Sequence, residues 1–231
     1  MSSHLSDGSV NGGFWRIAAR RLGRGVAAAA VLAVLAGSAG CKLFQGDGSG
    51  SSSIDVPLVY KPRDTDAVPA VRVPANAGVK VQIGDTDDKR DESERRSIGR
   101  NNEDKTSIPV YGTGGSVAGF VNKVILQQVK SARLTVTDDM AVVTRRLASE
   151  LLTFQVNEGS NYQGEVQVNF KVVDNTGKTM FERAYTGTAG NHGKSKSAEN
   201  YQETFSDATK KAVDQLLADP DFAAALVDEQ K

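Results

Sequence analysis

The chain has 231 residues, of which 24% are charged and 39% hydrophobic, and its 28 basic and 28 acidic side chains balance. A chain of this length holds one domain or two small ones. Removing residues 1–40 takes away four arginines and one aspartate, which leaves a net charge near −3. This charge excludes the basic footprint of a nucleic-acid-binding domain, so no nucleic-acid partner is expected.

The N-terminal segment has the layout of a secretory signal. An uninterrupted run of Ala, Val and Leu over residues 26–36 follows four arginines, Arg16, Arg20, Arg21 and Arg24. The run is shorter than the roughly 20 residues of a membrane-spanning helix. A basic start, a short apolar run and small residues after it are typical of a cleaved signal. The Arg20-Arg21 pair leaves twin-arginine export open beside the general secretory route.

The segment ends at Cys41, the only cysteine of the chain. The Ser-Ala-Gly-Cys sequence that ends there resembles the lipobox of bacterial lipoproteins, in which the signal is cut before the cysteine and the cysteine carries the lipid. The resemblance implies that residues 1–40 are a lipoprotein signal peptide, cut between Gly40 and Cys41, and that Cys41 is acylated. In such lipoproteins an Asp after the cysteine favours the inner membrane. Lys42 therefore favours the outer membrane, where we expect a lipid-anchored protein that faces the periplasm.

Residues 41–70 have the composition of a flexible tether. Gly and Ser dominate residues 46–53, and prolines follow at Pro57, Pro62 and Pro69. Gly/Ser-rich segments behave as flexible coils, and proline removes a donor from a strand ladder. We therefore expect the folded domain to span residues 71–231.

Within this domain, the first expected strand covers Gly78–Ile83, where apolar and polar residues alternate. Residues 84–109 follow, dense in charged and amide side chains, and a solvated loop is expected there. The acidic residues of this loop invite the idea of a cation site. They lack the spacing of a calcium loop, so no metal is expected at Asp85, Asp87, Asp88, Asp91 and Glu92.

A helix is expected after Ser116, a candidate N-cap, because apolar residues recur at intervals of three and four. The glycines of Gly112–Gly115 precede it. They lack the spacing of a phosphate-binding loop, which favours a hinge at the helix start. Residues 138–150 fit either a helix capped by Asp138-Asp139 or a strand that begins near Arg146.

The clearest β pattern lies between residues 151 and 187, where three stretches alternate apolar and polar residues across two turns. A long helix is expected over about Ser197–Ala218, stopped by Pro220, with a short turn over residues 222–227. The simplest assembly is an α+β, two-layer domain. Its antiparallel sheet has about four strands, two main helices cover one face, and a disordered tether precedes it.

Six segments between residues 151 and 222 are more specific than their periodicity: Leu151–Gly159, Tyr162–Val166, Val173–Lys178, Arg183–Gly187, Asn200–Ala208 and Leu216–Phe222. Together they look like the YajG-type uncharacterised bacterial lipoproteins and the auxiliary lipoproteins of ABC transport systems. The resemblance covers about residues 78–226 and the lipobox. It implies a lipid-anchored periplasmic domain without assigned catalytic residues, so only Cys41 carries over as a functional position.

The sequence shows no catalytic constellation. His192 is the one histidine after Cys41, and Ser195 lies between Lys194 and Lys196 in a polar loop that gives no reason for a buried, neutral lysine. No catalytic residue, metal or cofactor is expected. We therefore expect a non-enzymatic binding or adaptor module that serves a transport or assembly system and has a protein or lipid partner in the envelope. The alternative is an envelope hydrolase that uses carboxylates of residues 85–104.

Overall fold

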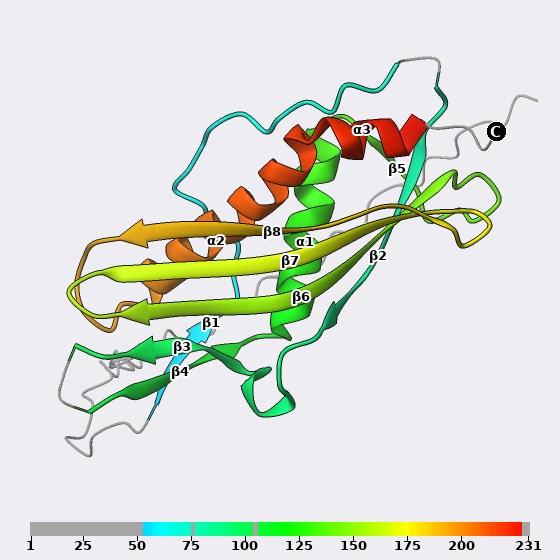
Figure 1. The fold of residues 1–231 in the computed structure, drawn as a ribbon. Helices are drawn as coiled ribbons and strands as arrows, with labels where there is room; N and C mark the ends of the chain where they lie inside the picture. Colours follow the sequence, from blue (N-terminus) through cyan, green and yellow to red (C-terminus); the bar gives the residue numbers. More distant parts are fainter. Residues whose placement is uncertain (1–52, 75–76, 104–105, 228–231) are drawn as a thin grey trace, which may run out of the picture. The chain divides into compact units, whose positions relative to one another are not determined.

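The computed structural model describes residues 53–74, 77–103 and 106–227, all within one unit of the chain that spans residues 47–231. These residues form an eight-stranded sheet and three α-helices (Figure 1). In chain order the elements are β1 (Ile54–Pro57), β2 (Lys80–Asp88), a 3-10 turn η1 (Glu92–Glu94), β3 (Ser97–Asn101), β4 (Ile108–Thr113), α1 (Val117–Ser131), β5 (Thr135–Val136), β6 (Arg145–Glu158), β7 (Tyr162–Asp174), β8 (Thr179–Asn191), α2 (Ala198–Ala218) and α3 (Pro220–Val227).

Three long antiparallel strands, β6, β7 and β8, form the centre of the sheet. Every second side chain of β7 is buried, as expected for a strand with one face on the core. The turn between β7 and β8 places Gly177 at a φ of 89°, which favours glycine. The carboxylate of Asp174 accepts hydrogen bonds from the amides of Thr176 and Lys178, at 2.8 Å and 3.0 Å. The predicted meander is confirmed.

Helices α1 and α2 cover the apolar face of these strands (Figure 1). Each begins after a serine, Ser116 or Ser197, whose hydroxyl accepts a hydrogen bond from the amide three residues on, at 3.0 Å and 3.4 Å. Phe120 of α1 and Phe205 of α2 meet edge to face with ring centroids 4.9 Å apart. Phe154 of β6 lies 5.9 Å and 5.7 Å from these two rings, so one aromatic cluster joins both helices to the sheet.

The opposite face of β6, β7 and β8 is covered by no helix among the described elements, and we call it the uncovered face (Figure 1). Polar side chains occupy it. The ammonium of Lys171 lies 3.2 Å from a carboxylate oxygen of Glu150 and 3.2 Å from one of Glu182. The amide of Asn169 donates to both carboxylates at 3.0 Å. A polar face is expected where a sheet meets water on one side.

Strand β6 shares its second edge between two parallel neighbours. β2 pairs with the first half of β6 and ends at the pair Asp88–Leu151. β3 pairs with the end of β6 and begins at the pair Gly99–Val156. Residues 152–155 of β6 therefore pair with neither strand. β5 extends the sheet beyond β2, and β4 and β1 extend it beyond β3, so the sheet is mixed and forked along this edge.

The predicted antiparallel sheet of about four strands with two main helices is wrong, although the α+β class holds. The sheet has eight strands with four parallel pairings, and α3 is a third helix. Residues 84–109 carry most of the difference, because the predicted solvated loop contains the end of β2, all of β3 and the start of β4. β3 reads Ser-Ile-Gly-Arg-Asn, so its composition resembles a loop and its strand state comes from its neighbours.

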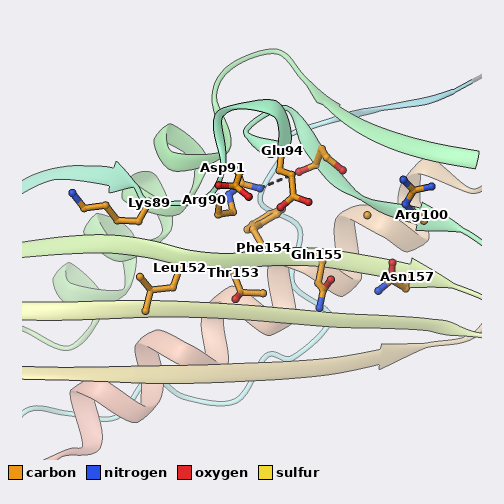
Figure 2. A pocket seen from close by; sticks show the side chains of 12 residues that line it. Lys89, Arg90, Asp91, Glu94, Arg100, Leu152, Thr153, Phe154, Gln155 and Asn157 are labelled. Carbon is orange, nitrogen blue, oxygen red and sulfur yellow. Dashed lines mark hydrogen bonds between the residues drawn. The ribbon is translucent and has the colours of Figure 1, made fainter.

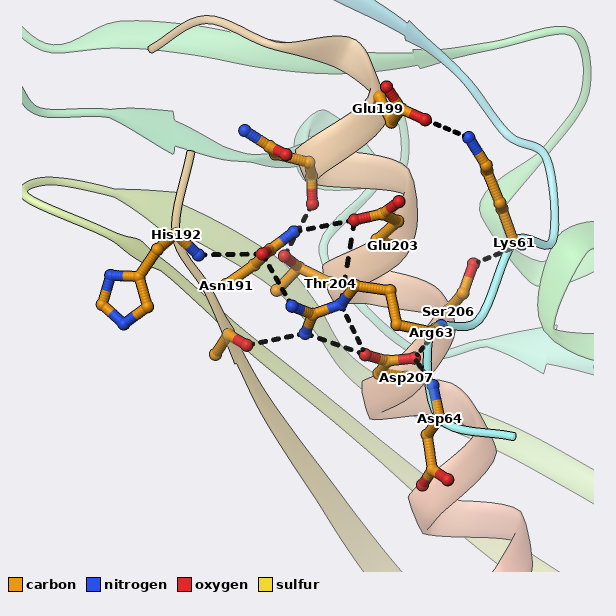
Figure 3. A network of polar contacts seen from close by, with 12 residues as sticks. Lys61, Arg63, Asp64, Asn191, His192, Glu199, Glu203, Thr204, Ser206 and Asp207 are labelled. Carbon is orange, nitrogen blue, oxygen red and sulfur yellow. Dashed lines mark hydrogen bonds and ion pairs between the residues drawn. The ribbon is translucent and has the colours of Figure 1, made fainter. Parts of the chain in front are cut away.

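The disordered tether that precedes the sheet in the predicted fold is also corrected from residue 53 onward. Residues 54–57 form β1, which is parallel to β4, and Val56 is fully buried. Residues 58–66 then run along α2 and are called the strap below (Figure 3). A four-residue strand shows too little periodicity to be recognised, and it depends on the pairing that β4 offers.

The ambiguous segment 138–150 is resolved in favour of the strand, because β6 begins at Arg145. Asp139 caps a turn, its carboxylate accepting a hydrogen bond from the amide of Ala141 at 3.0 Å. Asp138 and Asp139 therefore do not begin a helix, and the helix alternative is wrong.

Candidate functional site

The predicted site residues, Gly40 and Cys41, lie outside the described residues. Cleavage of the signal and acylation of Cys41 stay predictions. No helix in residues 53–74, 77–103 and 106–227 is both long enough and apolar enough to span a bilayer.

The other residues weighed from the sequence do not come together as a catalytic group. His192 is exposed at the end of β8, and its amide donates to the Asn191 side chain at 2.8 Å. Lys194 and Lys196 are exposed on either side of Ser195. The described part of the chain holds no group of three or more His, Cys, Asp or Glu side chains that could bind a metal ion.

A polar concavity of about 390 Å³ lies where β6 passes from β2 to β3, beside the uncovered face (Figure 2). The loop over residues 89–96, which contains η1, stands beside it. We call this concavity the notch. Its lining residues are Lys89, Arg90, Asp91, Glu94, Ser97, Gly99, Arg100, Leu152, Thr153, Phe154, Gln155 and Asn157.

Arg90 fixes the loop that walls the notch. Its guanidinium donates to both carboxylate oxygens of Asp88, at 2.9 Å and 2.7 Å, and to the carbonyl oxygens of Arg95 and Ser97, each at 3.0 Å. It also lies over the ring of Phe154, 5.9 Å from the centroid. Only 5% of the Arg90 side chain is exposed. Arg90 therefore holds the loop in place and has little capacity left for a ligand.

Gly99 allows β3 to approach β6 and so sets the far wall of the notch. Its φ is 140°, a conformation that other residues rarely adopt. A Cβ atom at this position would lie 1.9 Å from the carbonyl oxygen of Val156, far inside van der Waals contact. The close approach of the two backbones therefore requires glycine, and the notch is built into the fold.

The charged side chains of the notch fall into paired and unpaired groups. Lys89 forms an ion pair with Asp87 at 2.5 Å. Arg100 donates to the hydroxyl of Ser107 at 3.2 Å, a neutral partner. Asp91 and Glu94 are exposed, and among the described residues neither carboxylate forms an ion pair or a hydrogen bond (Figure 2). Among the described residues that line the notch, the guanidinium of Arg100 and the carboxylates of Asp91 and Glu94 thus have no charged partner and can bind a ligand.

The acidic residues that were predicted to lie in one solvated loop belong to different parts of the structure. Asp85, Asp87 and Asp88 belong to β2, and Glu92 lies on η1 but does not line the notch. Only Asp91 from that run lines it, together with Glu94. The notch cannot be read from the sequence, because its floor and walls come from two strands, β6 and β3, and from the loop over residues 89–96, whose grouping a linear pattern does not show. The one local signal is Gly99, an isolated glycine between Ile98 and Arg100, which can mark a close backbone approach.

A larger concavity, about 710 Å³, lies between residues 69–74 and the corner of α2 and α3. Its walls are mostly apolar, formed by Pro69, Ala70, Arg72, Pro74, Leu217, Ala218, Asp219, Pro220, Ala223, Ala224 and Val227. Residues 75–76 and 228–231, which continue the chain from two of its walls, lie outside the described residues.

A buried carboxylate, Glu158, closes β6 on the core side of the sheet. One of its oxygens accepts a hydrogen bond from the Tyr201 hydroxyl at 2.7 Å, and the other accepts one from the Lys196 amide at 2.9 Å. Burial raises the pKa of Glu158, but the hydrogen bonds favour the charged form more strongly, so its pKa lies below the ordinary value. The arrangement ties the end of β6 to α2 and is structural.

Comparison with known proteins finds no matching family model and no matching curated protein. Among solved structures, the chain is similar to XCC0632 from Xanthomonas campestris, of the family DUF330, at 10% identity and a TM-score of 0.46, covering 72% of this chain and 90% of that one. A PelC dodecamer from Paraburkholderia phytofirmans gives 14% identity, a TM-score of 0.38, and coverage of 68% and 94%. Lipoprotein GNA1162 from Neisseria meningitidis gives 9% identity and a TM-score of 0.31, and the match covers 51% of this chain and 88% of that one.

GNA1162 is described as a lipoprotein, which is the class of protein that the N-terminal sequence predicts. None of the three proteins is described as YajG-type. TM-scores below 0.5 carry no argument about function. The lipoprotein prediction therefore continues to rest on the residues around Cys41.

Proposed function

We propose that this chain is a bacterial lipoprotein of the cell envelope, held at the outer membrane through acylated Cys41 and facing the periplasm. Its folded domain acts as a non-enzymatic binding module that serves a transport or assembly system. The notch is the binding site in this proposal. The observation that carries it is a preformed polar concavity on a sheet face that no described helix covers.

The corrected position of β1 supports the anchored arrangement. Ile54 already belongs to the sheet and lies 13 positions after Cys41. A chain of that length spans at most about 47 Å when fully extended. The tether expected from the sequence, which ran to residue 70, would have allowed more than twice that reach. A lipid on Cys41 would therefore keep the domain close to the bilayer surface.

The construction of the notch supports the binding role. Its volume of about 390 Å³ falls within the range of small-ligand sites, roughly 300–1,000 Å³. Gly99 and Arg90 hold its walls in one arrangement, so a ligand would not have to order them. Preorganisation of this kind reduces the entropic cost of binding.

The anchor is tested by metabolic labelling with palmitate and by fractionation of the envelope. The wild-type chain should take up label and sediment with the outer membrane, whereas Cys41→Ser should do neither. Ser38→Cys in the Cys41→Ser background, which moves the thiol by three residues, is the matched control and should not restore labelling. Palmitate labelling of Cys41→Ser equal to wild type contradicts the anchor.

The binding role is tested by site-specific photo-cross-linking in intact envelopes. A cross-linking amino acid at Gln155, in the notch, should capture a discrete species, whereas the same group at Gln127, an exposed position on α1, should not. Equal capture from both positions would mean that the notch has no special role.

A hydrolase is the second candidate, because two carboxylates, Asp91 and Glu94, do line the notch. Carboxylate pairs can act as general acid and base in glycoside hydrolysis. Turnover of purified cell-wall glycan that disappears in both Asp91→Asn and Glu94→Gln would favour the hydrolase over the binding module.

A further inference from the structure

The notch presents opposite charges on two of its walls. Asp91 and Glu94 come from the loop around η1, whereas Arg100 comes from β3, and Figure 2 shows them at separate places around the opening. The remaining charged groups are occupied, because Arg90 binds Asp88 and Lys89 binds Asp87. A ligand therefore meets carboxylates on one wall and a guanidinium on another.

The floor between these walls comes from β6 and suits a polar backbone. Gln155 and Asn157 line the notch, and each side-chain amide can donate and accept hydrogen bonds. Leu152, 37% exposed, adds an apolar contact at one end. Amide side chains complement peptide groups, which also carry one donor and one acceptor each.

We propose that the notch binds a small zwitterionic ligand of the kind that a short peptide presents, with an ammonium group at Asp91 and Glu94 and a carboxylate at Arg100. The proposal deepens the binding function proposed above and rests on it. An ammonium and a carboxylate both form charge-assisted hydrogen bonds, which are stronger than neutral ones. The guanidinium of Arg100 also has the planar fork that a carboxylate fits.

The balance of charge distinguishes this ligand from a simple ion. An anion such as phosphate would meet Arg100 but also two carboxylates, which repel it. A metal cation would meet two carboxylates but also a guanidinium on the neighbouring wall. A ligand with both charges uses all three side chains, and its two end groups fix its direction in the notch.

The test uses the full chain, purified in detergent, and trialanine in four forms: with both ends free, with the amino end acetylated, with the carboxyl end amidated, and with both ends blocked. Isothermal titration calorimetry gives the dissociation constants, and hydrogen-exchange mass spectrometry locates the site. The free peptide should protect residues 152–157 and 89–100. Each single block should weaken binding about tenfold, the scale of one lost charge-assisted hydrogen bond.

Two charge-removing variants assign each end group to a wall. In the double variant Asp91→Asn with Glu94→Gln, acetylation of the peptide should cause no further loss of affinity, while amidation still weakens binding about tenfold. In Arg100→Gln the pattern should reverse. The matched controls change exposed residues that do not line the notch: Asp85→Asn with Glu92→Gln, and Arg95→Gln. Both controls should keep the wild-type ranking of the four peptides.

Equal binding of the free and the doubly blocked peptide overturns the proposal, as does the absence of any heat with the free peptide at about 10 mM, above the roughly 1 mM constant of a weak ligand. Protection confined to the apolar concavity at α2 and α3 overturns it as well. These failures leave the anchored binding module intact, because photo-cross-linking from Gln155 can still capture a macromolecule. Failure of the Cys41 labelling experiment, in turn, leaves the peptide titration unaffected.

Discussion

The guanidinium of Arg63 and the carboxylate of Asp207 join two segments that lie 144 positions apart in the chain (Figure 3). Nε and Nη2 of Arg63 donate to one oxygen of Asp207 at 3.1 Å and 2.9 Å. The other oxygen accepts hydrogen bonds from the backbone amides of Arg63 and Asp64, at 2.7 Å and 3.1 Å. Asp207 is 5% exposed, so this interaction fastens the strap to α2 in a partly dry environment.

Arg63→Ala should loosen the strap without unfolding the domain. The variant leaves a nearly buried Asp207 with only its two backbone donors. We expect a loss of about 1–2 kcal/mol in the free energy of unfolding, measured by urea denaturation. Hydrogen exchange should increase at residues 58–66. Arg95→Ala removes an exposed guanidinium from the loop beside the notch and should lower stability by less than about 0.5 kcal/mol. An equal loss in both variants would show that the strap is not fastened by this pair.

Gly99→Ala should be the most damaging small substitution on the notch side of the sheet. The added methyl group would overlap the carbonyl of Val156, and the φ of 140° would be strained for alanine. Overpacking and backbone strain each cost about 1–3 kcal/mol. We expect the melting temperature to fall sharply or the protein to be recovered unfolded. Gly159→Ala is the control, because a Cβ there meets no atom within 4 Å. Wild-type stability of Gly99→Ala would contradict the required close approach.

The sequence predicts those helices and strands whose apolar residues recur with a regular period along the chain. The stripe of α1, the cap at Ser116 and the alternation in β7 each depend on residues close in the chain, and the structure confirms them. β1 and β3 are short, and β3 is polar. They become strands because β4 and β6 offer them partners, which is information that a local pattern does not contain.

The candidate site also depends on strand pairing that a local sequence pattern does not contain. Asp91 stands out in the sequence as part of an acidic run, but its grouping with Arg100 and Gln155 depends on the fork in the sheet. The lipidation site is the opposite case. Cys41 is predicted from adjacent residues alone, because signal cleavage and acylation are local events that precede folding.

The outer edge of β8 is closed by side chains rather than by another strand. β8 pairs only with β7 among the described strands. Three of its carbonyl oxygens, at alternate positions, accept side-chain hydrogen bonds. Gln215 donates to Thr186 at 2.9 Å, Lys211 to Thr188 at 3.2 Å, and Arg63 to Gly190 at 2.7 Å. Occupied carbonyls and charged side chains hinder the addition of a strand from another molecule.

The double variant Lys211→Ala with Gln215→Ala should therefore self-associate more readily than wild type. Without these caps, the edge of β8 can pair with the same edge of a second copy. Analytical ultracentrifugation over a concentration series should show a dimer or larger species that the wild type lacks at the same concentration. Gln127→Ala with Lys130→Ala removes the same residue types from an exposed face of α1 and should leave the distribution unchanged. Identical distributions for all three proteins would exclude a guarding role.

The buried carboxylate of Glu158 should make stability depend on pH in the acid range. Its pKa is lower in the folded than in the unfolded chain, so between the two values the unfolded chain binds more protons. The contribution is therefore complete above the unfolded value, about 4.3, and is lost as pH falls through the lower folded value. Urea denaturation between pH 7 and pH 3 should show this loss.

Glu158→Gln separates this carboxylate from the other acids of the chain. The variant keeps the shape of the side chain but removes the charge that the Tyr201 hydroxyl and the Lys196 amide stabilise, so we expect a loss of about 1–3 kcal/mol at pH 7. The stability of the variant should also fall less steeply than that of wild type as the solution is acidified, and the two curves should converge at low pH. Glu165→Gln, on the uncovered face, should match wild type at pH 7, since no hydrogen-bonded carboxylate in the core is lost. Parallel curves for wild type and Glu158→Gln, separated by the same free energy at every pH, would mean that packing around the side chain, and not its charge, holds β6 to α2.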